Sequence, residues 1–495
     1  MSGRIAGGPS QLLHDEVLQP QYEYEATHLL PWYILIEKVL AVEYLRMGLV
    51  SDKQAASLGQ ALDRARTELP AADPQGNMSD IAFALERYTE ATQPETVIHW
   101  HVDRSRNDLQ ASAQILFACE RLRSTADLLM QFGRAAHRLA MQHRHHPMPG
   151  YTHFQAAQIV TPGFYLAALS EHALHTSRRL LATYDSTALS PLGSGAMAGQ
   201  ELAWDRERMA GLLGLPAPQP HAWTGVASRH WAAEIAAELS LFGLGVSRFS
   251  TDLLTWGSSE YGFIDLPDSL SGISSAMPQK KNFPVLERIR GRSGHLSAFH
   301  FDMVLGQRNT PYTNLVEVSK EAGAHLKSAF DTTDSLLRLF TAVLDHMSFD
   351  VDRMAAACER DFFGGFTLAN LLTTREGIPW RTAQVISGQY IVAAMNAGRT
   401  PREPDAALLV EAARSNGQQV RQPEGLLGDA FDVEGSLYGK RTSGSVHPDA
   451  VLELLDQQHA EFERLREEWQ QRVDFSAVGA LETDRLLGLG TEGPA

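Results

Sequence analysis

The sequence LQASAQILFACERLRSTADLLMQFGRAAHRLAMQHRHH, residues 109–146, contains no proline and no paired glycine. Its apolar side chains recur at the three- and four-residue spacing of an α-helix. At 1.5 Å per residue, a helix of this length spans roughly 57 Å, about twice an ordinary globular helix. Pro147 and Pro149 follow directly and end it. The stretch therefore predicts one very long helix.

Helical periodicity continues on both sides of this stretch, over residues 26–49, 162–184, 231–256, 284–305 and 320–347. Alternating strand patterns are scarce. Several long helices with apolar faces favour an all-α fold built around a helical bundle.

The length of the chain and the positions of its glycines and prolines predict three domains. Residues 1–105 are expected to form an N-terminal helical domain, and residues 106–362 carry the long helices. From Phe363 onward the helices shorten and glycine and proline become frequent, as in Gly377-Ile378-Pro379. This predicts a smaller C-terminal helical domain over residues 363–495.

The composition limits the classes of binding partner that we expect for this protein. The chain has 495 residues, a formal net charge of -16 and only two cysteines, Cys119 and Cys358. An acidic chain is not expected to bind nucleic acid or an anionic membrane, so an anionic substrate would need a local basic cluster. Two cysteines without metal spacing predict a reduced, cytoplasmic setting. Neither a signal peptide nor an apolar run long enough for a membrane helix is predicted.

A first polar cluster, His101–Asp108, precedes the long helix. Ser105 and Asn107 are good N-cap residues, and a helix N-terminus offers free backbone N–H groups to a carboxylate. Arg104 and Arg106 add charged donors. The pattern predicts a carboxylate site, although an ordinary capped helix start with solvated charges has the same composition.

A second cluster, Gly150–Gln155, follows the end of that helix. His153 carries the side chain best suited to move a proton near neutral pH, and the hydroxyl of Thr152 can bind an anion. The alternative is a loop histidine with no chemical task.

A third cluster, Ser271–Asn282, is rich in small residues and precedes a helix that bears Glu287. Its composition predicts a mobile loop that can close over a substrate. Lys280 would supply positive charge and Asn282 a neutral donor. A flexible basic surface loop is the alternative.

Taken together, the three clusters resemble the signature loops of argininosuccinate lyase, in the fumarase/aspartase superfamily. That family has the segments His-Thr-Gly-Arg-Ser-Arg-Asn-Asp, Gly-Tyr-Thr-His and Gly-Ser-Ser-x-x-Pro-x-Lys-x-Asn, in this order. Residues 191–199, 367–382 and 435–441 also resemble family segments. Chance agreement of three ordered motifs is negligible.

The resemblance implies an all-helical, three-domain fold whose central bundles pack into a homotetramer, with each active site shared between three subunits. It implies a carbon–nitrogen lyase that reversibly eliminates fumarate from an N-substituted aspartate such as argininosuccinate. No cofactor or metal is implied.

The resemblance also implies roles for individual residues. Ser274 would remove the Cβ proton and Lys280 would stabilise the aci-carboxylate intermediate. His153, oriented by Glu287, would protonate the leaving nitrogen. The substrate-binding residues implied are Ser105, Arg106, Asn107, Thr152, Gln155, Arg229, Ser275, Met277, Asn282, Tyr312, Glu317 and Lys320.

The sequence departs from the family pattern mainly where the leaving group would bind. Glu317 replaces a glutamine between Tyr312 and Lys320, and residues 221–225 replace an Asn-Ser-x-Asp-Ala segment. In the serine-bearing loop, Ile273 replaces a glycine and Phe283 a proline. The leaving group therefore stays open between arginine and a diamine or amino acid, as in lyases of ethylenediamine-disuccinate. An added carboxylate would suit a cationic amine.

Three other readings compete. A non-catalytic, crystallin-like relative would share the fold, but the proposed catalytic side chains are all present. Four histidines (His137, His143, His145 and His146) could suggest a metal site, although no carboxylate or cysteine is grouped with them. The glycine-rich segment 193–199 lacks the preceding strand and downstream acid of a dinucleotide-binding fingerprint.

Overall fold

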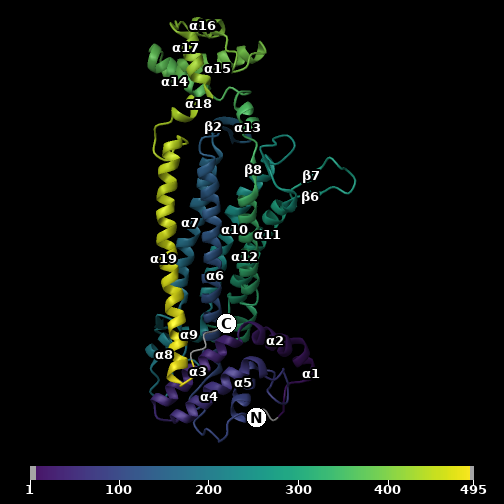
Figure 1. Ribbon diagram of the computed structural model, residues 1–495, viewed down its shortest axis with the longest axis vertical. Coiled ribbons are helices and arrows are strands. Elements are labelled where there is room, and N and C mark those ends of the chain that lie inside the picture. The colour runs from purple at the N-terminus through teal and green to yellow at the C-terminus, as the bar shows by residue number, and fades with distance from the viewer. Residues whose placement is uncertain (1–6, 491–495) are drawn as a thin grey trace.

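The computed structural model describes residues 7–490 and shows an elongated, predominantly helical molecule. A long bundle forms its middle, an N-terminal group of helices lies at one end, and a small helical unit lies at the other (Figure 1). The all-α prediction is confirmed.

The elements follow this order along the chain. The N-terminal group comprises α1 (Gln11–Leu13), the π-helix η1 (His14–Leu18), α2 (Gln19–His28), α3 (Leu30–Arg46), α4 (Asp52–Glu68) and α5 (Ile81–Ala91). The bundle comprises α6 (Arg106–Gln142), α7 (Pro162–Thr187), α10 (His230–Trp256), α11 (Pro284–Gln307), α12 (Leu326–His346) and α19 (Pro448–Leu486). The far unit comprises α13 (Val351–Cys358), α14 (Gly365–Glu376), α15 (Trp380–Asn396), α16 (Ala406–Ser415), α17 (Pro423–Phe431) and α18 (Val433–Tyr438). Short connecting helices are α8 (Arg206–Leu212), α9 (Ala222–Ala227), the 3-10 helix η2 (Asp268–Leu270) and the π-helix η3 (Glu317–Glu321).

Strands occur only as short pairs in the described part of the chain. They are β1 (Met148–Thr152) antiparallel to β2 (Gln155–Val160), β3 (Leu189–Ser190) parallel to β4 (Ala217–Pro218), β5 (Ile264–Asp265) antiparallel to β8 (Ser348–Phe349), and β6 (Gly272–Ile273) antiparallel to β7 (Lys281–Asn282). Two of these pairs, β1–β2 and β6–β7, carry predicted site residues.

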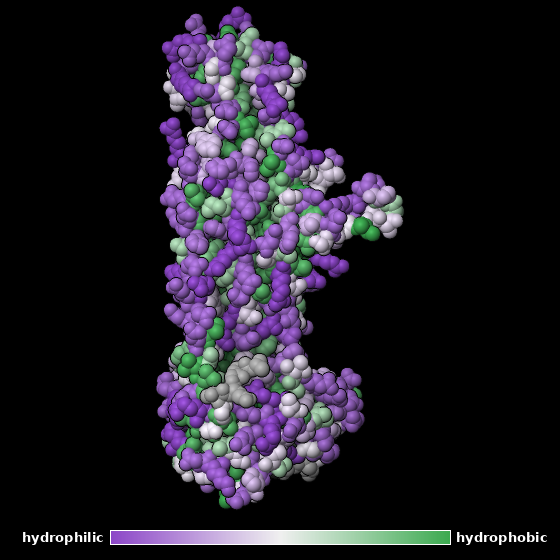
Figure 2. Space-filling view, viewed as in Figure 1, coloured by the Kyte–Doolittle hydropathy of each residue, from purple (hydrophilic) through white to green (hydrophobic). Residues whose placement is uncertain are grey.

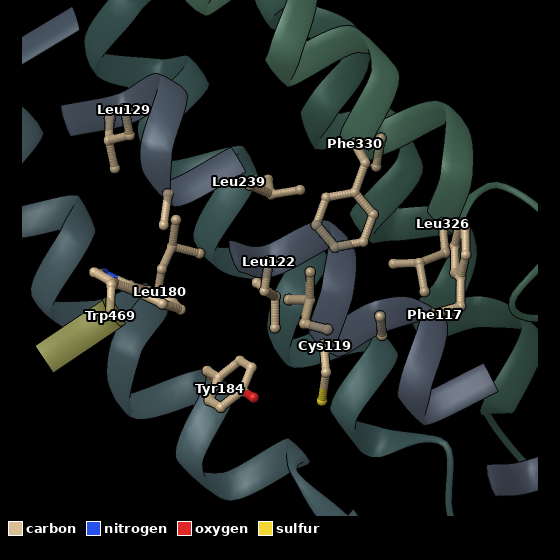
Figure 3. Close-up of a cluster of buried hydrophobic side chains, with 14 of the residues drawn as sticks. Phe117, Cys119, Leu122, Leu129, Leu180, Tyr184, Leu239, Leu326, Phe330 and Trp469 are labelled. Atoms are coloured by element: carbon tan, nitrogen blue, oxygen red, sulfur yellow. The ribbon is translucent and has the colours of Figure 1, made fainter. Parts of the chain in front are cut away.

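The bundle core is formed by side chains from helices that are distant in sequence. Figure 3 shows Leu122 of α6, Leu239 of α10 and Phe330 of α12 together in one apolar layer, and all three are buried. Tyr184 of α7 and Trp469 of α19 pack edge to face, with ring centroids 5.6 Å apart. Such packing buries the apolar stripe of each long helix, which is what makes helices of this length stable.

Gly133 lies in the interior of α6 because α19 approaches it closely. A Cβ atom at this position would lie 2.6 Å from the ring of Phe462 and 2.9 Å from Ala173. The helix-propensity cost of a glycine, about 1 kcal/mol, is therefore offset by tight packing of three helices.

The structure confirms the predicted long helices and corrects two details. The helix expected over residues 26–49 is divided at Leu29, and α3 begins at Leu30 with Pro31 in its first turn. The expectation that helices shorten after Phe363 is wrong at the end of the chain, because α19 has 39 residues. Pro448 lies in the first turn of α19, and no other proline occurs within the helix. This pattern is typical of a long helix that begins at a proline, and it can be seen in the sequence.

The far unit has a hydrophobic core of its own, formed by residues between Leu368 and Ala430. The helix α19, by contrast, runs along the bundle and packs on α6 and α7 (Figure 1). The division of the chain at residues 105 and 362 stays a prediction. This packing argues for assigning α19 to the bundle rather than to the unit that precedes it.

Two helices of the bundle expose large apolar side chains. These are Leu241 and Leu244 on α10 and Phe301, Val304 and Leu305 on α11. Figure 2 shows hydrophobic surface along the length of the bundle. None of the described helices is long and apolar enough to cross a membrane.

Candidate functional site

The three motif clusters lie in different parts of one chain. The helix-start cluster is residues 104–108 with segments 191–200 and 312–320; the hairpin is residues 150–155; the serine loop is residues 271–283. The 37 residues of α6 separate the first two by about 55 Å at 1.5 Å per residue. In Figure 1 the β6–β7 pair projects away from the side of the bundle. A single chain therefore does not bring its three clusters together.

Ser105 is the N-cap of α6, as predicted. Its hydroxyl accepts a hydrogen bond from the backbone N–H of Asn107, 3.2 Å away. The side-chain amide of Asn107 donates to the carbonyl of Ala196 at 3.0 Å and accepts from the amide of Asn314 at 2.9 Å. These contacts join three distant segments at the start of one helix, where backbone N–H groups favour an anion.

Asp108 anchors the glycine-rich segment to α6. Its carboxylate accepts backbone hydrogen bonds from Gly193 at 3.1 Å and Gly195 at 3.0 Å. Both glycines have positive φ, 88° and 60°, a backbone conformation that side chains disfavour. Burial raises the pKa of the Asp108 carboxyl to about 7. The backbone N–H groups of this segment thus bind a carboxylate of the same chain. This contact accounts for the two glycines, and no bound dinucleotide is needed to explain them.

We expect Asp108→Asn to remove a pH dependence of stability. A carboxyl whose folded pKa is raised from 3.8 to about 7 stabilises the fold below pH 4, and this contribution is lost as the pH rises through 7. The difference amounts to about 4 kcal/mol. Melting temperatures measured from pH 4 to pH 8 should fall more steeply in the parent protein than in Asp108→Asn, whose amide oxygen can still accept both N–H bonds.

Asp449→Asn is the matched control, since that side chain is 86% exposed. It should leave the pH profile of the melting temperature unchanged. An Asp108→Asn profile as steep as that of the parent protein would contradict the assignment.

Arg104 and Arg106 differ in their surroundings. Arg104 is buried in an ion pair with Glu37 and is therefore part of the structure rather than available to a ligand. Arg106 is more exposed, donates to Asp80 at 2.7 Å and lies over the ring of Phe83, 4.6 Å from its centroid. Both guanidinium groups already have a carboxylate partner in the chain.

Arg229 is buried beside a cavity of about 370 Å³ that Glu25, Gln114 and Lys320 also line. Its guanidinium donates to Gln114 at 2.9 Å and to two backbone carbonyls. Burial lowers the pKa of Arg229 to about 10. Gln114 in turn donates to the carbonyl of Ser319 at 2.7 Å, so the segment that bears Lys320 lies against α6.

Lys320 forms an ion pair with Glu25, which is buried in α2. Glu317 begins η3 and is exposed. Tyr312 is exposed too; its hydroxyl donates to Thr224 at 3.3 Å, and its carbonyl accepts from the indole of Trp223 at 2.7 Å. The structure therefore brings Arg229, Tyr312, Glu317 and Lys320 to the same end of the bundle as Asn107.

The hairpin presents His153 at its tip. Thr152 of β1 pairs with Gln155 of β2, which leaves His153 and Phe154 as the two turn residues, with φ of 55° and 60°. Positive φ at both positions is the geometry of a type I′ turn. Thr152, His153 and Gln155 are all exposed. The imidazole of His153 is thus exposed at the tip of a short β-hairpin.

The serine loop is a hairpin with Ser274 at the start of its tip. The Ser274 hydroxyl accepts a hydrogen bond from the backbone N–H of Met277 at 3.1 Å, and the N–H of Lys280 donates to the Met277 carbonyl at 3.0 Å. Asn282 donates weakly to Gly272 at 3.4 Å. Ser275, Met277 and Lys280 are exposed. A hydroxyl that accepts an N–H bond is better able to carry negative charge.

The two residues at which this loop differs from the family pattern, Phe283 and Ile273, have different environments. Phe283 packs on Gly257, where a Cβ atom would lie 2.6 Å from its ring, so the aromatic ring has room only because position 257 is glycine. Ile273 has 93% of its surface exposed although it pairs with Lys281 in the strand. Nothing in one chain explains an exposed isoleucine beside Ser274.

Several residues around the helix-start cluster were not identified from the sequence. Glu25, Asp80, Gln114 and Asn314 each hold a predicted site residue. Glu25, Asp80 and Gln114 lie outside the motifs, so no local pattern pointed to them. Asn314 lies within the segment from Tyr312 to Lys320, but its partner Asn107 is distant in sequence. His153 and Glu287 form no hydrogen bond with each other within residues 7–490 of one chain.

The histidines near the end of α6 make contacts of their own. The Nδ1 atoms of His143 and His146 lie 3.0 Å apart, and His137 bonds the carbonyl of Leu455 at 2.8 Å. Across the residues that the structure describes, no three histidine, cysteine, aspartate or glutamate side chains are grouped as metal ligands.

Comparison with known proteins identifies the family. A family model described as lyase matches residues 50–296. Argininosuccinate lyase 1 of Shouchella clausii is 29% identical over 92% of this chain and 92% of its own. Argininosuccinate lyase of Pelotomaculum thermopropionicum is 31% identical over 85% of this chain and 90% of its own.

Solved structures share the fold. An EDDS lyase in complex with formate matches with a TM-score of 0.85 at 23% identity, over 98% of this chain and 97% of that one. A class II fumarase from Schistosoma mansoni matches with a TM-score of 0.66 at 15% identity, over 84% and 91%. With the three ordered motifs and relatives that extend over most of its length, the chain belongs to the argininosuccinate lyase family of the fumarase/aspartase superfamily and is a carbon–nitrogen lyase.

Proposed function

We propose that this lyase splits an N-substituted aspartate into fumarate and an amine, at sites that loops of different subunits build together in a homotetramer. The observation that supports this most directly is the serine loop. It places the hydroxyl of Ser274 on the N–H of Met277, at 3.1 Å, in the same exposed tip as the ammonium of Lys280. An alkoxide formed there would be stabilised by both groups.

The reaction would proceed by anti elimination. The alkoxide of Ser274, formed when its hydroxyl proton passes to solvent, takes the Cβ proton and becomes a hydroxyl again. The electron pair moves into the neighbouring carboxylate to give an aci-carboxylate held by Lys280 and Asn282. The pair then forms the Cα–Cβ double bond as the C–N bond breaks. His153, oriented by Glu287 of another subunit, gives the nitrogen its proton. Fumarate and a neutral amine or guanidine leave.

The remaining predicted residues would position the substrate. The carboxylates of the succinyl half would lie on neutral donors and on the start of α6; these residues are Ser105, Asn107, Thr152, Gln155, Ser275 and Met277. The leaving group would lie nearer Arg106, Arg229, Tyr312, Glu317 and Lys320. The length of α6 between the helix-start cluster and the hairpin supports the proposal that these two clusters come from different subunits.

Exposed apolar side chains support the tetramer. Leu244 of α10 is 60% exposed and Phe301 of α11 is 64% exposed. Packing these faces on partner bundles would remove them from water, the main driving force for association. A cytoplasmic location also remains our proposal, supported by the two buried free thiols, Cys119 and Cys358.

Incubation with fumarate tests the activity. Fumarate absorbs in the ultraviolet, so addition of an amine across its double bond is followed as loss of absorbance. Arginine, ethylenediamine, longer diamines and amino acids are offered in turn, and turnover with at least one is expected. Absence of turnover with every amine, in protein shown to be folded and oligomeric, would favour the crystallin-like alternative.

A further inference from the structure

The cavity beside Arg229 lies close to the helix-start cluster. Its volume of about 370 Å³ is in the range of small-molecule sites. The two π-helices found in residues 7–490 both line it: Glu16 and Val17 belong to η1, and residues 318–321 belong to η3. π-Helices are rare and frequently occur at functional sites. The cavity is therefore a candidate binding site in its own right.

Arg229 brings a positive charge into this cavity without a carboxylate to balance it. The residue is only 4% exposed. Its Nε donates to Gln114 and its Nη1 to two backbone carbonyls, whereas Nη2 has no hydrogen-bond partner among the described residues. Burial lowers the pKa of Arg229 only to about 10, so the guanidinium stays charged at neutral pH. A buried cation with a free donor favours an anionic ligand.

Lys320, the other cation that lines the cavity in the described chain, is already neutralised. It forms an ion pair with Glu25, and the two side chains are 18% and 5% exposed. A new carboxylate could bind Lys320 only by displacing a buried one, which would then lack a partner. Arg229 is therefore the residue of this cavity that an incoming anion would bind.

Much of the remaining cavity wall is apolar. Buried side chains from four segments contribute to it, namely Leu29, Phe117, Val318 and Leu326. Glu16 and Glu321 also line the cavity, but both are exposed, so water screens their charges. An apolar wall with one unpaired cation suits a ligand that has an aliphatic body and a carboxylate at its end.

The position of Gln114 sets the distance from Arg229 to the helix-start cluster. Gln114 follows Asn107 by seven residues, two helical turns, so both lie on one face of α6, roughly 10 Å apart along its axis. Asn107 is a proposed ligand of a succinyl carboxylate. An extended chain advances about 1.3 Å per bond, because three bonds carry one Cα to the next over 3.8 Å. Roughly eight bonds would therefore separate that carboxylate from one bound to Arg229.

We infer that the leaving amine carries a carboxylate at the far end of an apolar stem, and that Arg229 binds this carboxylate. The inference rests on the proposed function. Two bonds separate the nearer succinyl carboxylate from the reacting nitrogen, which leaves about six bonds from that nitrogen to the remote carboxylate. Straight-chain ω-amino acids of five or six carbons have this length. Arg229 thus determines the specificity for the leaving group and takes no part in the elimination.

A chain-length series tests the inference. The full-length enzyme receives fumarate with glycine, β-alanine, 4-aminobutyrate, 5-aminopentanoate or 6-aminohexanoate, and kcat/KM is measured from the loss of ultraviolet absorbance. The value should rise at least 10-fold from glycine to the five- or six-carbon acid. It should also be at least 10-fold higher for 6-aminohexanoate than for pentylamine, the same chain without the carboxylate. A flat series, equal use of pentylamine, or better use of arginine than of every ω-amino acid would overturn the inference.

Arg229→Gln provides a second test. The ratio of kcat/KM for 6-aminohexanoate to that for pentylamine should fall at least 10-fold, mainly through the KM of the acid. Arg414→Gln is the matched control, since Arg414 lies in the far unit and its side chain is 75% exposed; it should keep the parental ratio. An unchanged ratio in folded Arg229→Gln would count against the assignment. If that variant does not fold, the chain-length series decides.

Failure of the proposed function has a different signature. In that event no amine of the series or of the wider screen would consume fumarate. Hexanoate, which has the stem and the carboxylate but no amine, tests the cavity without turnover by isothermal titration calorimetry. The parent protein should bind hexanoate at least 10-fold more tightly than acetate, and at least 10-fold more tightly than Arg229→Gln does. Equal binding by parent and variant, or binding by neither, would contradict the role of Arg229.

Discussion

Ser274→Ala is expected to lower the rate of fumarate formation by about 10³-fold, the scale typical of losing a positioned base. The variant removes the one hydroxyl that the N–H of Met277 holds at the tip of the serine loop. Lys280 and Asn282 remain, so binding of the substrate should change much less than turnover. Initial rates followed by ultraviolet absorbance, with KM measured separately, give both quantities.

Ser271→Ala is the matched control for this substitution. Ser271 lies at the base of the same loop, where its hydroxyl donates to the carbonyl of Pro267 at 2.9 Å. Its loss should alter activity only a few-fold. Near-parental activity in Ser274→Ala would remove the proposed base, whereas equal losses in the two variants would point to a structural effect on the loop.

Mixing two inactive variants is expected to restore activity. We expect Ser274 and His153 of one site to come from different chains. A site in a mixed tetramer is then intact when a His153→Ala chain supplies Ser274 and a Ser274→Ala chain supplies His153. Random assembly at equal amounts gives about one quarter of the parental activity (one half times one half). The variants are refolded together, and tetramers that carry both of two affinity tags are isolated.

Each variant refolded alone is the control and should stay inactive. Doubly tagged tetramers without activity would mean that each chain supplies its own serine and histidine, or that the site is located elsewhere. The prediction follows from the position of the serine loop, which projects away from the side of the bundle, whereas the hairpin that bears His153 lies beyond the end of α6 (Figure 1).

The sequence predicted those features that depend on neighbouring residues. The span of α6 follows from its periodicity and from Ser105, which caps it as expected. Residues 150–155 and 271–282 were predicted as site loops because the proposed site residues of each are adjacent in sequence. That each forms a β-hairpin was not predicted. The long helix α19 was missed although it begins at a proline and contains no other.

Other features depend on contacts between distant residues, and no local pattern reveals them. Glu25 of α2 neutralises Lys320 of η3, and Asn314 donates to Asn107 at the same end of the bundle. Packing of the whole molecule decides such pairs. The proposed association of the three clusters would involve further chains, so neither local sequence patterns nor the contacts within one subunit reveal it.

The length of α6 has a consequence for the tolerance of this protein to insertions. The helix carries Asn107 at one end and leads to Thr152 at the other, and its ends would serve two separate reaction chambers. One inserted residue would turn one end relative to the other by about 100° and shift it by about 1.5 Å. Both sites would be misaligned together, so an insertion or deletion within α6 should be tolerated far less well than one in any surface loop.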